Sequence, residues 1–494
     1  MIAVTSVENM RQSDKMTIET KISSKELMYR AGLGIFESVD WHGEILVAAG
    51  TGNNAGDGYV LAELLKDKGY SVSLLLLENK FSDDGRYYFD RCICKKVPWS
   101  VYNLQKLQGY DIIVDCIFGT GFKGEPQGAA KVLIDSINES GAYVVSADIN
   151  SGMNGDSGIG VGCVKSQLTV SIGSYKYGHF LNQAKDKIGK LVNVDIGIDL
   201  IDTSCHILEE NDVKKLLFPR DNYSNKGTYG YITIIGGCAE YSGAVKLANL
   251  AASAMRAGCG VVKLAVPKSI CSSVAPYLLE STLYPLDDKD GDVVFSEKQI
   301  QGALNNTKAL AIGMGWGQKG ENEKILRYVL TSYEHPVIID ADGLNTLAKM
   351  GSDAVKGAKC PLVLTPHLKE FERLCGVEIA EIQKAPVFFA REYAKKTGVI
   401  LLLKGPTTII TDGEQVVLST RGTAGMATAG SGDVLSGILC ALCARCDNNL
   451  LEAVSVGAYI NGYAGEIAAV EYGDISMVAS DTVSSIPKAI KKLR

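Results

Sequence analysis

The stretch ILVAAGTGNNAGDG at residues 45–58 contains a short apolar run that ends in glycines and asparagines, directly before a helical pattern. This order predicts a buried β-strand followed by a tight turn and a helix. At the carboxyl end of a parallel strand, glycines let the backbone approach a ligand, and the helix N-terminus offers N–H groups and a positive dipole to phosphate. The same residues also fit a turn in which the asparagine and aspartate side chains only cap the helix.

Strand-like and helical segments alternate on both sides of this stretch. In the first half, β-rich apolar runs begin at residues 45, 72, 111, 142, 168 and 190, and helical patterns occupy 59–69 and 129–141. We expect residues 1–40 to be helical, because Ser23 to Glu26 form a capping-box pattern ahead of an apolar periodic segment. This alternation predicts βαβ units and a parallel sheet with helices on both faces.

The alternation stops in the polar, charged segment 201–227 and then resumes. Further β-rich runs begin at residues 231, 261, 310, 337, 362, 399 and 407, a small-residue helix is predicted at 243–258, and a long apolar helix follows Gly432. We therefore predict an α/β protein with two three-layer αβα domains. Their expected bounds are 1–205 and 225–494, joined by a linker at 206–224.

The amino-acid composition limits the classes of function that the protein can have. The 494 residues are 46% hydrophobic and 21% charged, with a net charge of −6 and no basic run, so nucleic acid is not the expected partner. No signal segment or membrane-length apolar run is present, and thirteen cysteines indicate a reducing compartment, so we expect a cytoplasmic enzyme acting on small molecules. Cys440, Cys443 and Cys446 form a CxxCxxC that could hold a metal, but their spacing fits one face of a buried helix better.

Two further strand ends in the first half carry polar residues. The segment 111–128 supplies Asp115, then several glycines, and Lys123 for a phosphate, whereas VVSADINSG presents Asp148 and Ser151. A partly desolvated carboxylate such as Asp148 can serve as a general acid or base, although it can equally be a cap or turn former. Two glycine-rich loops at strand ends predict a nucleotide-sized ligand.

Residues 8–200 resemble the NAD(P)H-hydrate epimerase family, a Rossmann-like fold. The motifs are MRQSDKMTIE, ISSKELMYRAG, GNNAGDG, VDCIFGTGFKG, ADINSG and SIGSYKYGHF with VDIGI; Ala55 and Asn150 stand where the family commonly has glycine and proline. The resemblance implies that Asp148 is the acid/base residue and that Asn54, Asp115 and Ser151 bind a potassium ion. It implies a substrate site made of Asn53, Asn54, Ala55, Gly56, Asp57, Gly119, Thr120, Gly121, Phe122, Lys123, Gly124, Glu125 and Asp148.

The second half has a glycine-rich turn, RGTAGMATAGSGD at residues 421–433, directly before the long apolar helix. Its backbone N–H groups can surround an anion, and no G-x-x-x-x-G-K-[ST] pattern is present. Asp433 in the first turn could merely complement the helix dipole. Beside an anion site, a carboxylate is unfavourable unless it takes a proton from an attacking hydroxyl, so we favour a catalytic base.

Residues 212–494 resemble the ribokinase-like fold and, within it, the ADP- or ATP-dependent NAD(P)H-hydrate dehydratases. The motifs are NKGTYGYITIIGG, YSGA, AIGMGWG, IIDADGLN, LTPHLKEFERL, LLKGPTTII and GMATAGSGDVLSG. Departures at Asn225, at Leu368 and Lys369, and at Thr423 and Ala424 bear on donor preference. The resemblance implies that Ala244, Gly315, His367 and Asp433 contact the substrate. It implies a nucleotide site made of Lys404, Gly405, Pro406, Thr407, Thr408, Gly425, Met426, Ala427, Thr428, Gly430, Ser431 and Gly432.

The residues leave two of these assignments open, since His367 could be a strand-end cap and Lys404 a surface lysine. The family reaction implies Mg²⁺ with ADP or ATP, with Glu370 as an indirect ligand. Together the two resemblances imply an isomerase and lyase that epimerises the R and S forms of hydrated NADH and NADPH and dehydrates the S form. Alternatives are a kinase for another small metabolite with an N-terminal sensor domain, or an N-terminal scaffold. We also expect a homo-oligomer.

Overall fold

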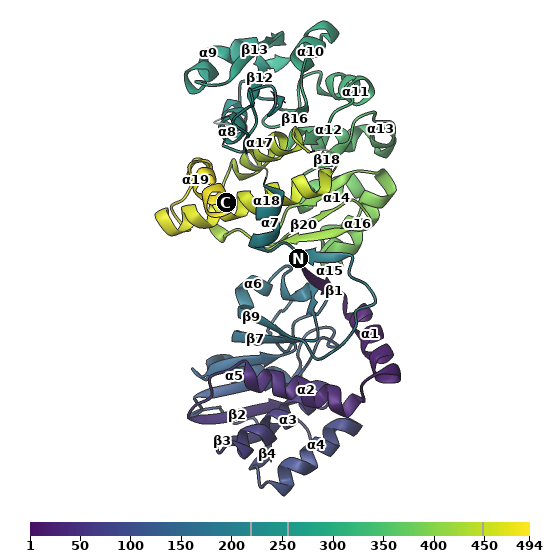
Figure 1. Cartoon of the computed structure of the whole chain (residues 1–494), viewed down its shortest axis with the longest axis vertical. Coiled ribbons are helices and arrows are strands. Elements are labelled where there is room, and N and C mark those ends of the chain that lie inside the picture. Colours follow the sequence, from purple (N-terminus) through teal and green to yellow (C-terminus); the bar gives the residue numbers. More distant parts are fainter. Residues whose placement is uncertain (218–219, 254–255, 447–448) are drawn as a thin grey trace. The chain divides into compact units, whose positions relative to one another are not determined.

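The computed structural model describes residues 1–217, 220–253, 256–446 and 449–494 (Figure 1). Internal contacts divide the chain into two units, one of Ala3–Cys205 and one of Met1–Ile2 together with His206–Arg494. Each unit is described by itself below. Within the described ranges, we find no helix that combines the length and the hydropathy needed to cross a bilayer.

The first unit is built around a seven-stranded sheet with the order β4-β3-β2-β5-β6-β7-β9, in which every neighbouring pair is parallel. The strands are β2 (Glu44–Ala49), β3 (Ser71–Leu76), β4 (Trp99–Val101), β5 (Ile112–Cys116), β6 (Tyr143–Ala147), β7 (Ser166–Ile172) and β9 (Ile188–Val194). Because β2 and β5 are buried on both faces, they read as continuous apolar runs, as the sequence predicts for central parallel strands.

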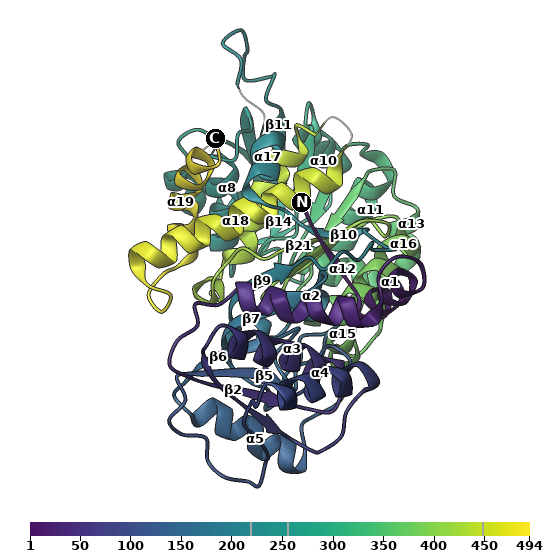
Figure 2. The same ribbon diagram turned by 60° about the horizontal axis from the view of Figure 1, so that its bottom comes forward.

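Helices cover both faces of this sheet (Figure 2). One face is covered by α2, α3 and α4, whose apolar side chains pack with those of β2, β3 and β5, and the other face is covered by α5. The helices of the unit are α1 (Val7–Thr20), α2 (Ser24–Glu37), α3 (Asn53–Asp67), α4 (Asp83–Cys94), α5 (Gly128–Glu139) and α6 (Ala184–Lys187), with a 3-10 turn at Tyr177–His179. The predicted three-layer arrangement is confirmed for this unit.

The prediction that residues 1–40 are helical is wrong at the start of the chain. Ile2–Thr5 form strand β1, which pairs in parallel with β8 (Tyr175–Lys176), and the segment then divides into α1 and α2. The predicted cap is confirmed, because the Ser23 hydroxyl accepts a hydrogen bond from the N–H of Glu26. The partner of β1 lies about 170 residues away, and local periodicity carries no information about such a partner.

The second unit contains a sheet with the order β13-β12-β11-β16-β17-β18-β19-β20-β21. The strands from β13 to β19 are parallel, whereas β20 and β21 add an antiparallel edge. They are β11 (Tyr231–Ile235), β12 (Val261–Pro267), β13 (Thr282–Leu286), β16 (Ala309–Ile312), β17 (Val337–Ile339), β18 (Leu362–Leu364), β19 (Ile400–Leu403), β20 (Thr408–Thr411) and β21 (Val416–Ser419); β14 (Asp288–Lys289) and β15 (Asp292–Val293) form a separate small hairpin.

Helices α8, α17, α18 and α19 pack their apolar residues on one face of this sheet, and Figure 1 shows α11, α12, α14 and α16 on the other side. Residues 254 and 255, within the predicted helix 243–258, lie outside the described residues. The helices are α8 (Ser242–Ser253), α9 (Cys271–Val274), α10 (Glu297–Leu304), α11 (Asn322–Ser332), α12 (Asp342–Met350), α13 (Ser352–Lys356), α14 (Leu368–Cys375), α15 (Ile379–Lys384), α16 (Pro386–Thr397), α17 (Ser431–Cys443), α18 (Leu450–Tyr472) and α19 (Ala479–Lys492), with 3-10 turns at Lys268–Ile270, Ala275–Tyr277 and Ala424–Met426.

The stretch expected to be a linker contains regular structure. It carries β10 (Cys205–Ile207) and α7 (Glu210–Leu216), and Val213 of α7 is fully buried in the core of the second unit. Residues 218 and 219 lie outside the described residues. From residue 206 onward, the described part of this stretch therefore packs with the second unit.

The fold shows the environment of the cysteines. All thirteen cysteines are free thiols, and Cys440 and Cys443 are buried on α17, as expected for a core-facing helix side. Cys446 follows the end of the helix and is partly buried. Among the described residues, no group of three or more histidine, cysteine or acidic side chains is arranged to hold a metal.

Candidate active sites

The first site begins at the carboxyl end of β2. Gly50 lies so close to β5 that a Cβ atom there would be 1.9 Å from the carbonyl oxygen of Ile117, so only glycine allows the two strand ends to approach. Asn53 and Asn54 then start α3 directly, so the motif expected as a loop forms the first turn of a helix. The N-cap residue Gly52 has no side chain to cap the helix, which leaves the helix N-terminus open toward a ligand.

Asp148 connects the second glycine-rich loop to the rest of this site. The backbone N–H and the hydroxyl of Thr120 both donate to Asp148 Oδ2 across 2.9 Å. A Cβ atom on Gly119 would approach Asp148 Oδ2 to 2.9 Å, so the glycine permits this contact. Asp148 itself has a φ of 63°, a left-handed conformation that is unusual for a residue other than glycine and is often found at functional sites.

Lys176 is the central residue of this site to which the sequence analysis gave no role. Its side chain is only 2% exposed, and its Nζ donates to Asp148 Oδ1 across 2.8 Å and to the carbonyl oxygen of Ile172 across 2.7 Å. Burial alone would raise the pKa of Asp148, but the charge and hydrogen bond of Lys176 and the N–H of Thr120 lower it below its usual value. The Asp148 carboxylate is therefore held in its ionised form.

His179 contacts the backbone of both residues of this pair. Its Nδ1 accepts the N–H of Lys176 across 3.0 Å, and its Nε2 lies 2.7 Å from the carbonyl oxygen of Asp148. Burial and the nearby Lys176 charge lower the pKa of His179 to about 4, so the ring is neutral near pH 7. A neutral ring that accepts at Nδ1 carries its proton on Nε2, which matches a hydrogen bond from Nε2 to a carbonyl.

Asp148, Lys176 and Thr120 line a pocket of about 760 Å³, which is within the range expected for a nucleotide-sized ligand. The pocket also includes Asp14 and Arg11 from α1, two residues that the sequence motif contained but to which it gave no role. Of the predicted substrate residues, Ala55, Gly56, Lys123, Gly124 and Glu125 are not in the pocket lining. Those that line it are Asn53, Asn54, Asp57, Gly119, Thr120, Gly121, Phe122 and Asp148.

The three residues expected to bind potassium are all buried. Asp115 is completely buried and accepts hydrogen bonds from the hydroxyl groups of Ser146 and Ser151, and burial raises its pKa despite these bonds. The side-chain oxygen and nitrogen of Asn54 are both buried without a hydrogen-bond partner. A buried carboxylate and an unsatisfied buried amide oxygen are both ligands of the kind that a hard cation takes.

The second site lies where β17, β18 and β19 end and α17 begins. Lys404 Nζ donates to Asp340 Oδ1 across 2.9 Å, and the Ser436 hydroxyl donates to Asp340 Oδ2 across 2.7 Å. A Cβ atom on Gly432 would lie 3.5 Å from both Asp340 Oδ2 and Lys404 Nζ, so the glycine-rich turn lies against this pair. Lys404 is therefore a largely buried ion-pair partner, and the interpretation as a surface lysine is wrong.

Asp433 occupies the first turn of α17, as predicted. Burial and the neighbouring Asp340 carboxylate raise its pKa to about 7, an effect that Lys404 partly offsets. A carboxyl group with a pKa near neutrality can accept a proton from a hydroxyl and release it again. Gly430, which precedes the helix, has a φ of 93°, so the turn needs glycine at this position.

His367 caps α14, as the alternative interpretation proposed. Its Nδ1 accepts the N–H groups of Lys369 and Glu370 across 3.1 and 3.2 Å, while the Glu370 carboxylate accepts the N–H of His367. His367 also pairs with Lys404 in an isolated parallel bridge, so it remains next to the ion pair. Its side chain is half exposed and can therefore cap the helix and still face a ligand.

The structure also brings together two residues expected to contact the substrate. A Cβ atom on Gly315 would lie 2.9 Å from the Cβ of Ala244, and Gly315 has a φ of 59°. Ala341, directly after Asp340, has a φ of 49° and is the second residue near a site with a strained backbone. Every residue assigned to this site lies within the second unit, just as the residues of the first site lie within the first unit.

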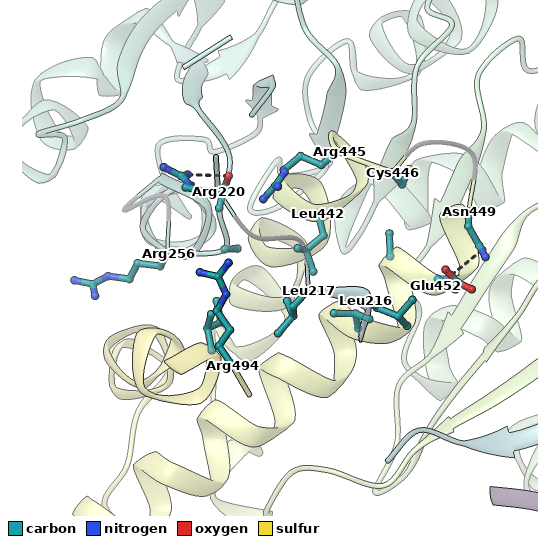
Figure 3. Close-up of a pocket in the computed structure, with 15 residues that line it drawn as sticks. Leu216, Leu217, Arg220, Arg256, Leu442, Arg445, Cys446, Asn449, Glu452 and Arg494 are labelled. Carbon is teal, nitrogen blue, oxygen red and sulfur yellow. Dashed lines mark hydrogen bonds between the residues drawn. The ribbon is translucent and has the colours of Figure 1, made fainter. Parts of the chain in front are cut away.

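A separate cavity of about 380 Å³ lies at the other end of α17 (Figure 3). Arg220, Arg256, Arg445 and Arg494 surround it together with apolar residues such as Leu442, and none of the predicted site residues lines it. The Arg220 guanidinium donates to the carbonyl oxygen of Gly258 and stacks 4.2 Å from the Tyr229 ring centroid. This arginine thus has a structural role.

Comparison with known proteins gives matches along most of the chain. Residues 24–178 match the family model described as YjeF-related protein N-terminus, and residues 232–488 match that of NAD(P)H-hydrate dehydratase. The bifunctional NAD(P)H-hydrate repair enzyme Nnr of Moorella thermoacetica is 33% identical, with 100% of this chain and 97% of that protein covered. The protein of the same name from Coxiella burnetii is 32% identical over 95% and 96% of the two chains.

Solved structures match the second unit. The ADP/ATP-dependent NAD(P)H-hydrate dehydratase from Bacillus subtilis, co-crystallised with ATP/Mg²⁺, is 29% identical with a TM-score of 0.51, covering 58% of this chain and 98% of that one. A ribokinase-like superfamily protein from Enterococcus faecalis, at 21% identity and a TM-score of 0.51, supports the fold alone. The matches over both halves and the two polar sites lead to one conclusion: the chain belongs to the family of bifunctional NAD(P)H-hydrate repair enzymes.

Proposed function

We propose that the first unit interconverts the R and S epimers of hydrated NADH and NADPH, and that the second dehydrates the S epimer with ADP or ATP as phosphoryl donor. The strongest support for this proposal is an arrangement of residues that occurs in both units. In each unit, a helix N-terminus and a buried pair of lysine and aspartate, Lys176 with Asp148 and Lys404 with Asp340, occupy the carboxyl ends of parallel strands. That position is where α/β folds bind nucleotides.

In the second unit, Asp433 accepts the proton of the substrate's ring hydroxyl while the hydroxyl oxygen attacks the terminal phosphorus of the donor. The bond between this phosphorus and the bridging oxygen of the donor breaks, so that ADP is converted to AMP, or ATP to ADP. Phosphate then leaves the ring with its bonding electrons, a neighbouring carbon loses a proton, and the dihydronicotinamide is restored. A base with a pKa near 7 suits the first of these steps.

The donor phosphates are proposed to lie against the glycine-rich turn and the segment that starts at Lys404. Mg²⁺, when bound, neutralises phosphate charge, and Glu370 would hold it indirectly. The substrate is proposed to contact Ala244, Gly315, His367 and Asp433. The proposed donor contacts are Lys404, Gly405, Pro406, Thr407, Thr408, Gly425, Met426, Ala427, Thr428, Gly430, Ser431 and Gly432.

In the first unit, Asp148 is proposed as the catalytic carboxylate beside the hydrated ring. Its ionised state lets it stabilise positive charge or accept a proton. Potassium is proposed to bind Asn54, Asp115 and Ser151, because the buried Asp115 carboxylate and the unsatisfied Asn54 oxygen suit a cation. We also propose an epimerase domain at 1–205, a dehydratase domain at 225–494, a cytoplasmic location and a homo-oligomer.

The test is recovery of NADH absorbance from a mixture of both hydrate epimers, run separately with ADP and with ATP in the presence of Mg²⁺ and K⁺. Complete recovery supports both activities, whereas recovery of only the S fraction supports the dehydratase alone. If neither epimer is recovered by the pure protein, the proposed function is wrong. Accumulation of a stable phosphorylated product would instead indicate a kinase for a small metabolite.

A further inference from the structure

Asp14 and Asp57 line the pocket of the first unit, and neither carboxyl group has a hydrogen-bond partner among the described residues. Asp14 reaches the pocket from α1 and Asp57 from α3. They differ in this from Asp148, which receives hydrogen bonds from Lys176 and from two donors of Thr120. A carboxyl group that is partly buried and unpaired is unfavourable in its ionised form.

The charges that face these two groups also disfavour ionisation. The charged side chains that line the pocket are three cations and five acids: Arg11, Lys15 and Lys176 against Asp14, Glu19, Asp57, Asp84 and Asp148. Burial and the Asp148 charge raise the pKa of Asp14 to about 6, against the lowering effect of Lys176. Burial, Asp148 and Asp14 raise the pKa of Asp57 well above its usual value. The phosphates of a dinucleotide would add further negative charge.

Inversion at the hydrated carbon sets a clear chemical requirement. The ring hydroxyl must leave from one face as water, and water must return to the other face. One group must donate a proton to the departing oxygen, and a second group must accept a proton from the entering water. Since the reaction runs in both directions, the two groups must exchange these roles, which suits two carboxyl groups that share one proton.

We propose that Asp14 and Asp57 are the proton-transfer pair of the epimerase site, an inference that rests on the proposed epimerase function. The protonated member donates its proton to the hydroxyl oxygen. The carbon–oxygen bond breaks, its electrons leave with water, and the lone pair of the ring nitrogen forms a carbon–nitrogen double bond. Water then adds to the opposite face of that carbon and gives its proton to the ionised member. The net result is inversion of the carbon and transfer of one proton from one aspartate to the other.

Asp148 has a separate role in this mechanism. Lys176 and Thr120 hold it as a permanent carboxylate, so it is a poor proton donor and instead stabilises the cationic ring between the two steps. Asp14, Asp57 and Asp148 thus each have a task that matches their environment.

The experiment uses the full-length protein with Asp14→Asn, Asp57→Asn and a control, Glu8→Gln, which changes an exposed acid of α1 outside the pocket. Conversion of the purified R epimer to the S epimer is followed by chromatography after subtraction of the spontaneous rate. We expect each aspartate variant to be slower by about 100-fold or more, as for loss of a general acid or base. Glu8→Gln and all rates of S-epimer dehydration should stay within about twofold of wild type.

Two further readouts separate proton transfer from a structural role. In water labelled with ¹⁸O, each inversion by the wild type should place one labelled oxygen on the product. Asp14→Glu should recover part of the rate, and Asp14→Asn should abolish the change of rate with pH near 6. Retention of more than a third of the wild-type rate by either asparagine variant, or inversion without labelling, would overturn the inference. A wild-type protein without epimerase activity would refute the proposed function itself.

Discussion

Lys404 and Asp340 form a buried ion pair, 2.9 Å from Nζ to Oδ1, directly beneath the turn that starts α17. The pair keeps Asp340 ionised next to Asp433, since the charge of Lys404 lowers the pKa of Asp340 against the effect of burial. The Asp340 charge in turn helps to raise the pKa of Asp433. The second site therefore contains two aspartates with opposite protonation tendencies.

The first prediction concerns Asp433 as the base of the dehydratase. Asp433→Asn should lower the rate of S-epimer dehydration by about 10²- to 10⁴-fold and leave epimerisation unchanged. In the wild type, kcat/KM should fall about tenfold for each pH unit below about 7, because the protonated carboxyl cannot accept a proton. Both are measured by absorbance recovery from the purified S epimer. Asp353→Asn, at an exposed aspartate of α13, is the control and should match the wild type.

The second prediction concerns stability. The pKa of Asp433 is about 7 in the folded protein and lies above the value of an aspartate in the unfolded chain. Between about pH 4 and pH 7 the folded protein therefore retains a proton on Asp433 that the unfolded chain has already released. Stability contributed by this group is present at low pH and is lost as the pH rises to about 7. Asp433→Asn should therefore raise the free energy of unfolding at pH 8 by up to about 4 kcal/mol, and by less than half as much at pH 5. Urea titrations at both pH values measure this, and equal stability of the two proteins at pH 8 would contradict it.

The third prediction concerns the Lys404–Asp340 pair. Lys404→Met leaves a buried carboxylate without its cation and should destabilise the second unit by about 3–5 kcal/mol. Adding Asp340→Asn to this variant should recover part of the loss, because the uncompensated charge disappears. The midpoints of urea unfolding for the two single variants and the double variant give the coupling energy. If the losses of unfolding free energy in the two single variants simply add up to the loss in the double variant, Lys404 does not act through Asp340.

The fourth prediction concerns the proposed potassium site. Replacing KCl by choline chloride at equal ionic strength should lower the melting temperature of the first unit and slow epimerisation, because Asp115 loses a neighbouring cation. Asp115→Asn should remove this dependence on the ion. Differential scanning calorimetry in both salts, with S-epimer dehydration as the control activity, provides the measurement. An identical melting curve in the two salts would rule out potassium at these residues.

The central strands were predictable because they are short, apolar and bounded by glycines, and the cap at Ser23 has a local signature. Helix α4 was not predicted, since five of the twelve residues of Asp83–Cys94 are charged and, of its apolar side chains, only Tyr88, Phe89 and Cys92 are buried, in the core that α3 also lines. Strand β1 was predicted as helix, because its pairing partner is remote in sequence.

In the candidate sites too, the sequence revealed residues with a local signature and missed those whose role depends on a remote partner. Asp148, Asp433 and the glycine turns stand at strand ends, a position that the sequence pattern reveals. Lys176 and Asp340 were quoted within motifs but received no role, because their importance comes from a buried partner brought close by the fold. A lysine between apolar strands and a glycine-rich segment is a signal that could have indicated Lys176. Asp14 has no such signal, since it lies in the middle of helix α1, away from any strand end or glycine-rich segment.

Each site takes its assigned residues from a single unit, and this has a consequence for how such a protein can evolve. A gene for either half alone would still encode a complete set of reacting groups. Selection can therefore split the coding sequence, lose one half or pair it with a new neighbour without redesigning the chemistry of the other. What fusion adds is a fixed one-to-one ratio between the step that presents the usable stereoisomer and the step that consumes it.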